Sequence, residues 1–366
     1  MTQNRYVGIL LNASVYDRMC QGRKTGHEQI PFYEEAAAAH GLALCYLKLS
    51  SLAPGRTKRH VPALVRQGGR YARRVVETPA VIHNRAIHLD SRSRARLEAL
   101  SREGLEIFNL HTRYDKLMLH RLLEQSAVIR PHLPLTEQAR PEVLERLMRE
   151  YPALIVKPSN GSVGQGIMLL SLSEEGKWRW KYRSAKTGAW RSQYFGSRLP
   201  GELVRRLRKR SYLVQYFLPL AKYQGRPFDI RVSVQKNESG LWQTTGMVAK
   251  VARTGAFLTN VAQGGKVATM EQVFADHPGW NGAELQDRIG QLSVQIAEFL
   301  GGRLPGLADL GLDMGIMEDG HLIFIEANGR DQRYSFGEAG MHEVWKAVYR
   351  NPLGYARYLS NVDKTT

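Results

Sequence analysis

The sequence predicts two kinds of architecture: an N-terminal α/β domain with a parallel sheet, and a longer α+β part with a largely antiparallel sheet. With 366 residues, the chain is long enough for two or three domains. In the first 110 residues, apolar strand-like runs alternate with helix-like segments, as in a parallel sheet covered on both faces. Further along, short turns separate the strands, which favours antiparallel pairing. We therefore expect three domains, at 1–112, 113–212 and 213–366.

The N-terminal part alternates regularly between the two element types. We expect strands at 5–11, 43–49, 80–87 and 106–110, and helices at 28–40 and 91–102. The apolar run from Val7 to Leu11 is too short for a signal peptide, and no run approaches ~20 apolar residues, so we expect no membrane segment. Two cysteines, Cys20 and Cys45, do not indicate a disulfide framework, so a cytoplasmic protein is expected.

The remaining two thirds of the chain should contain a few helices and many strands. Helices are expected at 114–126, 140–150, 283–300 and 338–350. Strands are expected at 153–157, 166–172, 177–183, 190–195, 211–217, 228–237, 241–253, 312–318 and 321–326.

The charge of the chain is strongly positive, with 52 basic and 34 acidic residues. This balance concerns partners and not fold. Nucleic acid, an anionic surface and an acidic substrate all remain candidates, and so does a set of solvated faces without a partner. The basic residues concentrate in four runs, at 56–60, 66–74, 91–96 and 205–210.

One strand separates aromatic from cationic side chains. Trp178, Trp180 and Tyr182 alternate with Arg179, Lys181 and Arg183, so the two kinds occupy opposite faces. The cationic face could guide an acidic substrate such as a Glu-rich peptide. We favour the simpler interpretation, in which the aromatic rings pack inward and the cations are solvated. The separation also weakens a nucleic-acid interpretation, which requires rings and cations together.

The stretch HLIFIEANGRD, 321–331, ends a buried strand with two oxygen ligands. Glu326 and Asn328 lie two residues apart and so share a face. A turn at 318–320 would place Asp313, on the preceding strand, next to Glu326. Carboxylate and amide oxygens suit Mg²⁺ or Mn²⁺ better than zinc. The alternative is structural: Glu326 pairs with an arginine and Asn328 caps a turn.

A second motif, IVKPSNGSVGQGIMLL at 155–170, joins two apolar strands by a loop of small residues. Glycines allow backbone N–H groups to approach a polyphosphate, and Lys157 adds a positive charge. The motif lacks the Walker spacing and a following helix, which excludes a P-loop. It predicts a hairpin that closes over phosphates, although an ordinary glycine-rich hairpin remains the alternative.

The next strands carry further polar groups. The backbone around Gln215 could contact an adenine edge where its strand ends, and Asp229 shares a face with Arg231. Arg231 could neutralise a phosphate or form a structural ion pair. Lys250 and Asn260 add a cation and an amide to the same expected sheet.

Together these motifs resemble the ATP-grasp superfamily, and specifically its YheC/YheD branch of endospore coat-associated proteins. The resemblance covers essentially the whole chain and is most specific over 109–336. It implies an ATP-grasp fold with an N-terminal parallel α/β domain. It also implies an ATP site made by Lys116, Lys157, Ser159, Gly161, Ser162, Gly164, Gly166, Gln215, Tyr216, Leu218 and Asp229. Mg²⁺, or alternatively Mn²⁺, would be held by Asp313, Glu326 and Asn328.

Two positions depart from the pattern of the superfamily. Many ATP-grasp enzymes have a proline shortly after the ligand asparagine, but here Asn328 is followed by Gly329-Arg330-Asp331. An arginine is often found where this chain has Lys250, and a lysine cannot bind a phosphate in the same bidentate way. Neither departure removes a predicted metal ligand.

The resemblance implies an ATP- and Mg²⁺-dependent ligase that activates a carboxylate as an acyl phosphate for attack by an amine or thiol. An acidic peptide or protein is the substrate we expect. Arg231, Lys250 and Asn260 would act on the γ-phosphate or the acyl oxyanion. The alternatives are an ATP-grasp kinase, or a nucleic-acid-binding or spore-coat scaffold protein with a degenerate nucleotide site. Product analysis and salt-sensitive DNA binding would separate these alternatives from a ligase.

Overall fold

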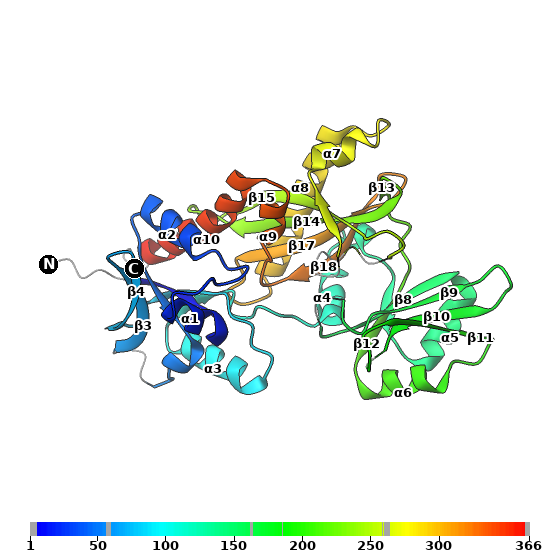
Figure 1. The fold of residues 1–366 in the computed structure, drawn as a ribbon, viewed down its shortest axis with the longest axis horizontal. Helices are drawn as coiled ribbons and strands as arrows, with labels where there is room; N and C mark the ends of the chain where they lie inside the picture. Colours follow the sequence, from blue (N-terminus) through cyan, green and yellow to red (C-terminus); the bar gives the residue numbers. More distant parts are fainter. Residues whose placement is uncertain are drawn as a thin grey trace.

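A computed structural model describes residues 6–55, 60–161, 164–184, 186–257, 259 and 264–362. The fold consists of three six-stranded sheets that follow one another along the chain. Figure 1 shows the first sheet at one end of the molecule, the second at the other end and the third between them. The predicted combination of an α/β part and an α+β part is confirmed.

The first sheet contains four parallel strands and an antiparallel hairpin at its edge, in the order β4-β3-β2-β1-β5-β6. The prediction of a wholly parallel sheet is wrong for β3 and β4, which the sequence analysis did not find. Gly68 and Gly69 join them with φ of 52° and 81°, values that glycine adopts without strain. The elements are β1 (Tyr6–Leu10), α1 (Ala13–Cys20), α2 (Ile30–Ala39), β2 (Ala43–Leu47), a 3₁₀ turn η1 (Leu49–Ser51), β3 (His60–Gln67), β4 (Arg70–Glu77), β5 (Val81–Asn84), α3 (Ser91–Arg102) and β6 (Glu106–Phe108).

The second sheet forms a lobe of its own, with the strand order β11-β10-β9-β8-β12-β7. Its inward face packs Trp178 and Trp180 against Leu203 of α6, which confirms that the aromatic residues point into the core. The elements are α4 (Lys116–Leu123), η2 (Arg130–His132), β7 (Thr136–Gln138), α5 (Pro141–Glu150), β8 (Ala153–Pro158), β9 (Met168–Leu172), β10 (Trp178–Arg183), β11 (Trp190–Phe195), α6 (Gly201–Lys209) and β12 (Tyr212–Tyr216).

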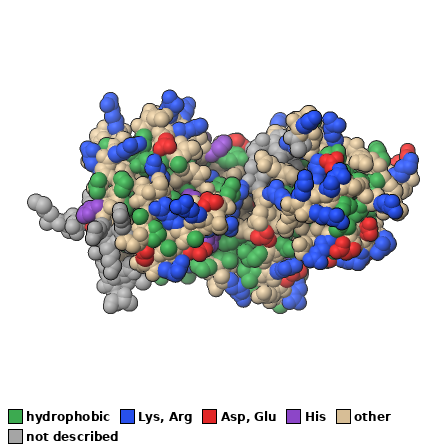
Figure 2. Space-filling model, turned by 90° about the horizontal axis from the view of Figure 1, so that it is seen from below, with side chains coloured by type: hydrophobic (Ala, Val, Ile, Leu, Met, Phe, Trp, Pro, Cys, Tyr) green, Lys and Arg blue, Asp and Glu red, His purple; other side chains and the backbone are tan. Residues whose placement is uncertain are grey.

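This lobe carries much of the positive charge. Between 174 and 210 the sequence has twelve Lys and Arg residues against three Glu residues. Figure 2 views the molecule from the side on which α6 lies and shows Lys and Arg side chains spread over this lobe. Several of them, including Arg205 and Arg208, are exposed and lie outside the core that Leu203 and Leu207 join.

The third sheet is antiparallel, in the order β16-β15-β14-β17-β18 with β13 paired to β14. Helix α8 covers one face through Ile289, Leu292 and Ile296. The closing helix α10 is longer than predicted and returns to the first domain, where it packs on α2 and β5. The elements are β13 (Lys222–Tyr223), β14 (Arg226–Lys236), β15 (Trp242–Val251), β16 (Lys266–Ala268), α7 (Met270–Ala275), α8 (Gly282–Gly301), β17 (Asp309–Ile316), β18 (Leu322–Asn328), α9 (Tyr334–Glu338) and α10 (His342–Val362).

A buried group of charges connects the first and third sheets. Arg85, which follows β5, lies 3.1 Å from Asp309 at the start of β17 and 3.1 Å from Glu28. Arg333 contacts Asp309 at 2.5 Å, and the His83 Nε2 atom is 3.3 Å from the same carboxylate. We call Glu28, His83, Arg85, Asp309 and Arg333 the domain-joining cluster. Among the described residues, no helix is long and apolar enough to cross a lipid bilayer.

Candidate active site

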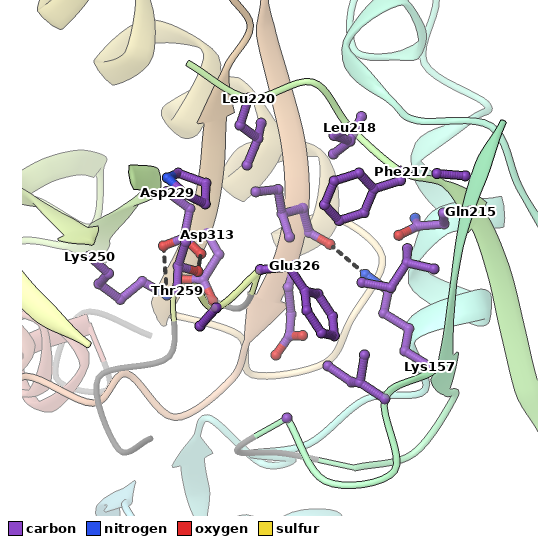
Figure 3. Close-up of a pocket in the computed structure, with 18 of the residues that line it drawn as sticks. Lys157, Gln215, Phe217, Leu218, Leu220, Asp229, Lys250, Thr259, Asp313 and Glu326 are labelled. Carbon is purple, nitrogen blue, oxygen red and sulfur yellow. Dashed lines mark hydrogen bonds and ion pairs between the residues drawn. The ribbon is translucent and has the colours of Figure 1, made fainter. Parts of the chain in front are cut away.

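A cavity of about 580 Å³ lies between the second and third sheets, and its size is typical of a small-molecule site. Figure 3 shows charged side chains entering it from opposite sides, with Lys157 on one side and Lys250 and Asp313 on the other. Ten of the predicted site residues line the cavity: Lys116, Lys157, Gly161, Gly164, Gln215, Leu218, Asp229, Lys250, Asp313 and Glu326. Apolar residues complete it: Ile155, Ile167, Phe217, Leu220, Phe257 and Ile325.

The β17–β18 hairpin places the predicted metal ligands next to one another. Asp313 pairs in register with Glu326, so the two side chains share a face of the sheet, and Asn328 follows on the same face. The predicted hairpin is therefore confirmed. Among the described residues, no three His, Cys, Asp or Glu side chains form a group that could hold a metal. Asp313 and Glu326 line the cavity and Asn328 does not, so the assignment of these three residues to a metal stays a prediction.

Both carboxylates of this group form ion pairs with cations. Lys116 Nζ lies 2.7 Å from Glu326 and donates a hydrogen bond to the carbonyl oxygen of Gly161. Arg231 Nε and Lys250 Nζ lie 2.8 and 3.0 Å from Asp313. Burial alone would raise the pKa of Asp313, but these two cations lower it overall, so the carboxylate stays ionised. Glu326 thus pairs with Lys116, and its charge also acts on Arg113.

Lys157 has fewer partners than Lys116 and Lys250, which also line the cavity. It is buried, and its Nζ donates a long hydrogen bond of 3.5 Å to the carbonyl oxygen of Ile325. Burial lowers the pKa of Lys157 to about 8; the neighbouring charge of Lys116 acts in the same direction and Glu326 opposes it. A phosphate that entered the cavity would therefore give this buried ammonium group an anionic partner.

The glycine-rich segment is a loop between two antiparallel strands, β8 and β9, as predicted. Gly164 and Gly166 have positive φ, and a Cβ on Gly166 would lie 3.0 Å from the Pro158 ring. Ser159 is fully buried and does not line the cavity; its carbonyl oxygen accepts a hydrogen bond from the backbone N–H of Lys116. Ser162 lies outside the described residues.

The connection after β12 forms the apolar end of the cavity. The Gln215 amide donates a 2.6 Å hydrogen bond to Thr136, and Leu218 lines the cavity. Tyr216 stacks on Tyr151 instead and does not line it. Phe217 and Phe257 also line the cavity, their ring centroids 6.3 Å apart. Phe217 lies within the stretch whose backbone was expected to contact adenine, whereas nothing in the spacing of the sequence indicates Phe257.

The remaining predicted residues come from β14 and β15. Lys250 Nζ lies 2.9 Å from Asp229, its partner in register, and Asp229 also accepts a hydrogen bond from Thr259. Arg231 contacts Asp331 at 3.2 Å in addition to Asp313 and does not line the cavity. Of the two roles that the sequence left open for Arg231, the structure shows an ion pair. Asn260 lies outside the described residues.

The sequence also matches a known family. Residues 104–359 match the family described as YheC/D-like ATP-grasp, which is more than half of the chain. The chain belongs to the YheC/D-like ATP-grasp family. It is 26% identical over 303 residues to the endospore coat-associated protein YheD of Bacillus subtilis (strain 168), covering 81% of this chain and 66% of that protein. It is 26% identical over 247 residues to YheC of the same organism, covering 67% of each chain. The chain thus spans about two thirds of the length of these relatives.

Solved structures share the fold of this YheC/D-like ATP-grasp protein. The ATP-grasp ligase PsnB, complexed with a phosphomimetic variant of its minimal precursor, Mg and ADP, matches 95% of this chain and 98% of its own, with a TM-score of 0.53 and 15% identity. A RimK domain ATP-grasp protein from Sphaerobacter thermophilus DSM 20745 matches 96% and 98%, with a TM-score of 0.51 and 15% identity. D-cycloserine synthetase DcsG matches 96% and 99%, with a TM-score of 0.51 and 12% identity. At these identities the similarity establishes the fold.

Proposed function

We propose that this YheC/D-like ATP-grasp protein is an ATP- and Mg²⁺-dependent ligase that joins a carboxylate to an amine, or to a thiol, through an acyl phosphate. One observation carries the proposal: Lys116, Lys157, Asp313 and Glu326 line a single cavity of about 580 Å³. Two lysines suit a polyphosphate, and two carboxylates would suit a divalent ion that accompanies it. The apolar end around Phe217 provides a surface for the base of ATP.

The donor atoms fit a hard divalent cation. Asp313, Glu326 and Asn328 would offer carboxylate and amide oxygens from one face of the β17–β18 hairpin, which suits Mg²⁺ and also Mn²⁺. When bound, the ion would neutralise charge on the β- and γ-phosphates. Lys116 and Lys250, which pair with these carboxylates, would then be available to contact phosphate oxygens.

The protein would contribute position and charge, as in other phosphoryl transfers. A substrate carboxylate oxygen would attack the γ-phosphorus atom, and ADP would leave. An amine would then attack the acyl carbon and give up one proton, and inorganic phosphate would leave with the bond electrons and take up that proton. We assign Lys157 to the phosphates and Lys250 to the charge that develops during transfer. Arg231 would hold Asp313 in place, because its side chain contacts both Asp313 and Asp331.

The direct test is ADP release in the presence of Mg²⁺ with a panel of amino acids and acidic peptides, followed by mass spectrometry of the products. We expect Lys157→Ala and Glu326→Ala each to reduce turnover about 10²–10³-fold while circular dichroism stays unchanged, because each removes one preorganised charge. Normal turnover in both variants would refute the site assignment. A phosphorylated product without a new amide or thioester would identify a kinase instead.

Two further properties are proposed for this chain because it is similar to proteins that have them in their names. Association with an endospore coat comes from the names of the two relatives. We propose for this chain a cytoplasmic location, with spore-coat association as the second possibility. The PsnB structures contain a precursor peptide, so peptides belong in the assay panel. Acidic peptides are included because of the positive charge of the chain.

A further inference from the structure

A second cavity, of about 280 Å³, lies where the first domain meets the turn after β18. Its walls come from α1, from the loop that precedes α2, and from the turn between β18 and α9. Its lining includes Arg18, His27, Arg85, Arg330, Arg333 and Tyr334.

The acidic residues of this second cavity are already neutralised. Glu28 is buried and accepts hydrogen bonds from Arg85, Arg330 and the Tyr33 hydroxyl, at 3.1, 2.8 and 2.6 Å. Asp331 is also buried and accepts hydrogen bonds from Arg231 and Ser233. Four arginines and two paired carboxylates line the space, so the lining has an excess of positive charge, although Asp309, outside the lining, also pairs with Arg85 and Arg333.

Two of the arginines retain donors for a ligand. Arg18 is exposed, and its side chain makes no ion pair or hydrogen bond with the described part of the chain. Arg330 uses one terminal nitrogen on Glu28, while its buried Nε has no acceptor among the described residues. A buried donor without an acceptor is unusual in a folded protein and indicates a missing partner. Anions, and carboxylates in particular, match such guanidinium groups.

An ion-pair chain links the second cavity to the ATP cavity: Arg231 contacts Asp331, which lines the second cavity, and Asp313, which lines the ATP cavity. Arg330 lies two residues after Asn328, at the end of the strand that carries Glu326. A group in the second cavity would therefore lie close to the predicted metal ligands.

The arginine comes from the position where this chain departs from the superfamily pattern. Gly329 packs tightly, since a Cβ there would lie 2.9 Å from the Tyr114 ring, and its carbonyl oxygen accepts a 2.6 Å hydrogen bond from Asn109. This packing fixes the backbone immediately before Arg330. The Gly-Arg-Asp sequence that stands in place of a nearby proline thus supplies a cavity-lining cation in this chain.

We infer that the second cavity binds the carboxylate that is activated, presented by a group of amino-acid size, and that Arg18 and Arg330 determine this specificity. The inference rests on the proposed ligase function. A volume of about 280 Å³ suits one amino acid or the terminal residue of a chain and is too small for an extended peptide. One carboxylate oxygen would face the arginines while the other attacks the γ-phosphorus atom and displaces ADP.

The test measures carboxylate binding to the full chain by calorimetry without nucleotide, so that it is independent of catalysis. The probes are L-glutamate, L-aspartate, L-alanine, glutarate and the tripeptide Ala-Ala-Glu, each beside its carboxyl-amidated counterpart. We expect at least one free carboxylate to bind, and its amide to bind at least tenfold more weakly. Free amino acids and the tripeptide distinguish a small-molecule substrate from a chain terminus.

Variants then locate the binding site. Arg18→Ala and Arg330→Ala should each weaken binding about tenfold, and Arg330→Lys should restore part of it, because a lysine keeps the charge but not the planar geometry. Arg23→Ala is the matched control: this exposed arginine lies in the neighbouring loop and outside the cavity lining, so binding should not change. Arg18 contacts no described partner, so its variant should fold even if Arg330→Ala disturbs Glu28.

The possible results distinguish a failure of the second cavity from a failure of the ligase proposal. The inference is overturned if no free carboxylate of the panel binds, if the amides bind equally well, or if Arg18→Ala binds like the wild type. Carboxylate binding that depends on Arg18, in a protein that never releases ADP, would support the second cavity and refute the ligase proposal. In an active ligase, Arg18→Ala should raise the KM for the carboxylate and leave the KM for ATP unchanged.

Discussion

The domain-joining cluster and the charged residues of the ATP cavity both lie inside the protein, but they differ in their exposure to solvent. Asp309, at the centre of the first, is fully buried and accepts hydrogen bonds from Arg85, Arg333 and Gln235. In the ATP cavity, side chains keep partial access to the open space: Lys116 is 17% exposed and Glu326 is 22% exposed.

Burial and pairing alone therefore do not identify a functional site. Nearby cations lower the pKa of Asp309 just as they lower that of Asp313, although burial acts against the shift in both. Only Asp313 lines a cavity in which a ligand could take over its ion pairs. We therefore assign stability to Asp309 and its ion pairs, and chemistry to the charged residues of the ATP cavity.

The largest expected effect on stability comes from breaking the domain-joining cluster. Asp309→Ala should lower the free energy of unfolding by about 3–5 kcal/mol, because it leaves two buried guanidinium groups without their shared carboxylate. Urea denaturation measures this loss. Lys116→Ala is the comparison, since it removes a partly exposed ion pair and should cost about 1 kcal/mol or less. Equal losses in the two variants would contradict the distinction between the clusters.

The same cluster should make stability depend on pH through His83. Burial lowers the pKa of His83 from 6.5 to about 4, although Asp309 opposes the shift. Between these values the unfolded chain binds a proton that the folded chain does not, so the stabilisation present above pH 6.5 is lost as the pH falls towards 4. The shift corresponds to about 3 kcal/mol. His83→Phe, which can still stack on Phe108, should remove this part of the slope in urea denaturation at a series of pH values.

In the ATP cavity the corresponding effect should appear in binding. The pKa of Lys157 is lowered to about 8, so its positive charge is present below that pH and is lost above it. We expect the affinity for ATP to fall about tenfold between pH 7 and pH 9.5, the cost of one charge-assisted contact. Lys157→Arg keeps its charge throughout and should bind with a flatter profile in calorimetry. A wild-type profile without a decrease would argue against Lys157 as a phosphate contact.

The sequence predicted a structural feature well where the pattern for that feature lay within a short stretch of the chain. The β17–β18 hairpin has a local turn signal and a period of two, and the structure confirms that Asp313 lies opposite Glu326. The β3–β4 hairpin was missed because Pro62 and a dense run of arginines obscure its strand pattern.

Contacts between distant residues could not be read from spacing. Lys116 and Glu326 are separated by 210 positions, so only the folded chain shows their ion pair. The sequence allowed Arg231 to contact either a phosphate or a carboxylate. Its ion pair with Asp331 shows the second role, and Asp331 lies beyond the last predicted strand. The rings of Phe217 and Phe257 likewise meet through tertiary structure alone.

The smallest effects should come from the basic surface of the second sheet's lobe, where contacts and not charge decide the outcome. Arg206 lies over the Trp180 and Tyr182 rings, at 5.3 and 4.5 Å from their centroids, and pairs with Glu202 on the same helix. Arg206→Ala should therefore lower the free energy of unfolding by about 1 kcal/mol. Arg205→Ala, its exposed neighbour on α6, should change it by less than about 0.5 kcal/mol. Both variants remove one positive charge. A difference between their melting temperatures in thermal denaturation therefore reports the contacts of Arg206 and not the loss of charge. If Arg205→Ala destabilised the protein as much as Arg206→Ala, the net charge of the lobe, and not the contacts of single side chains, would determine its stability.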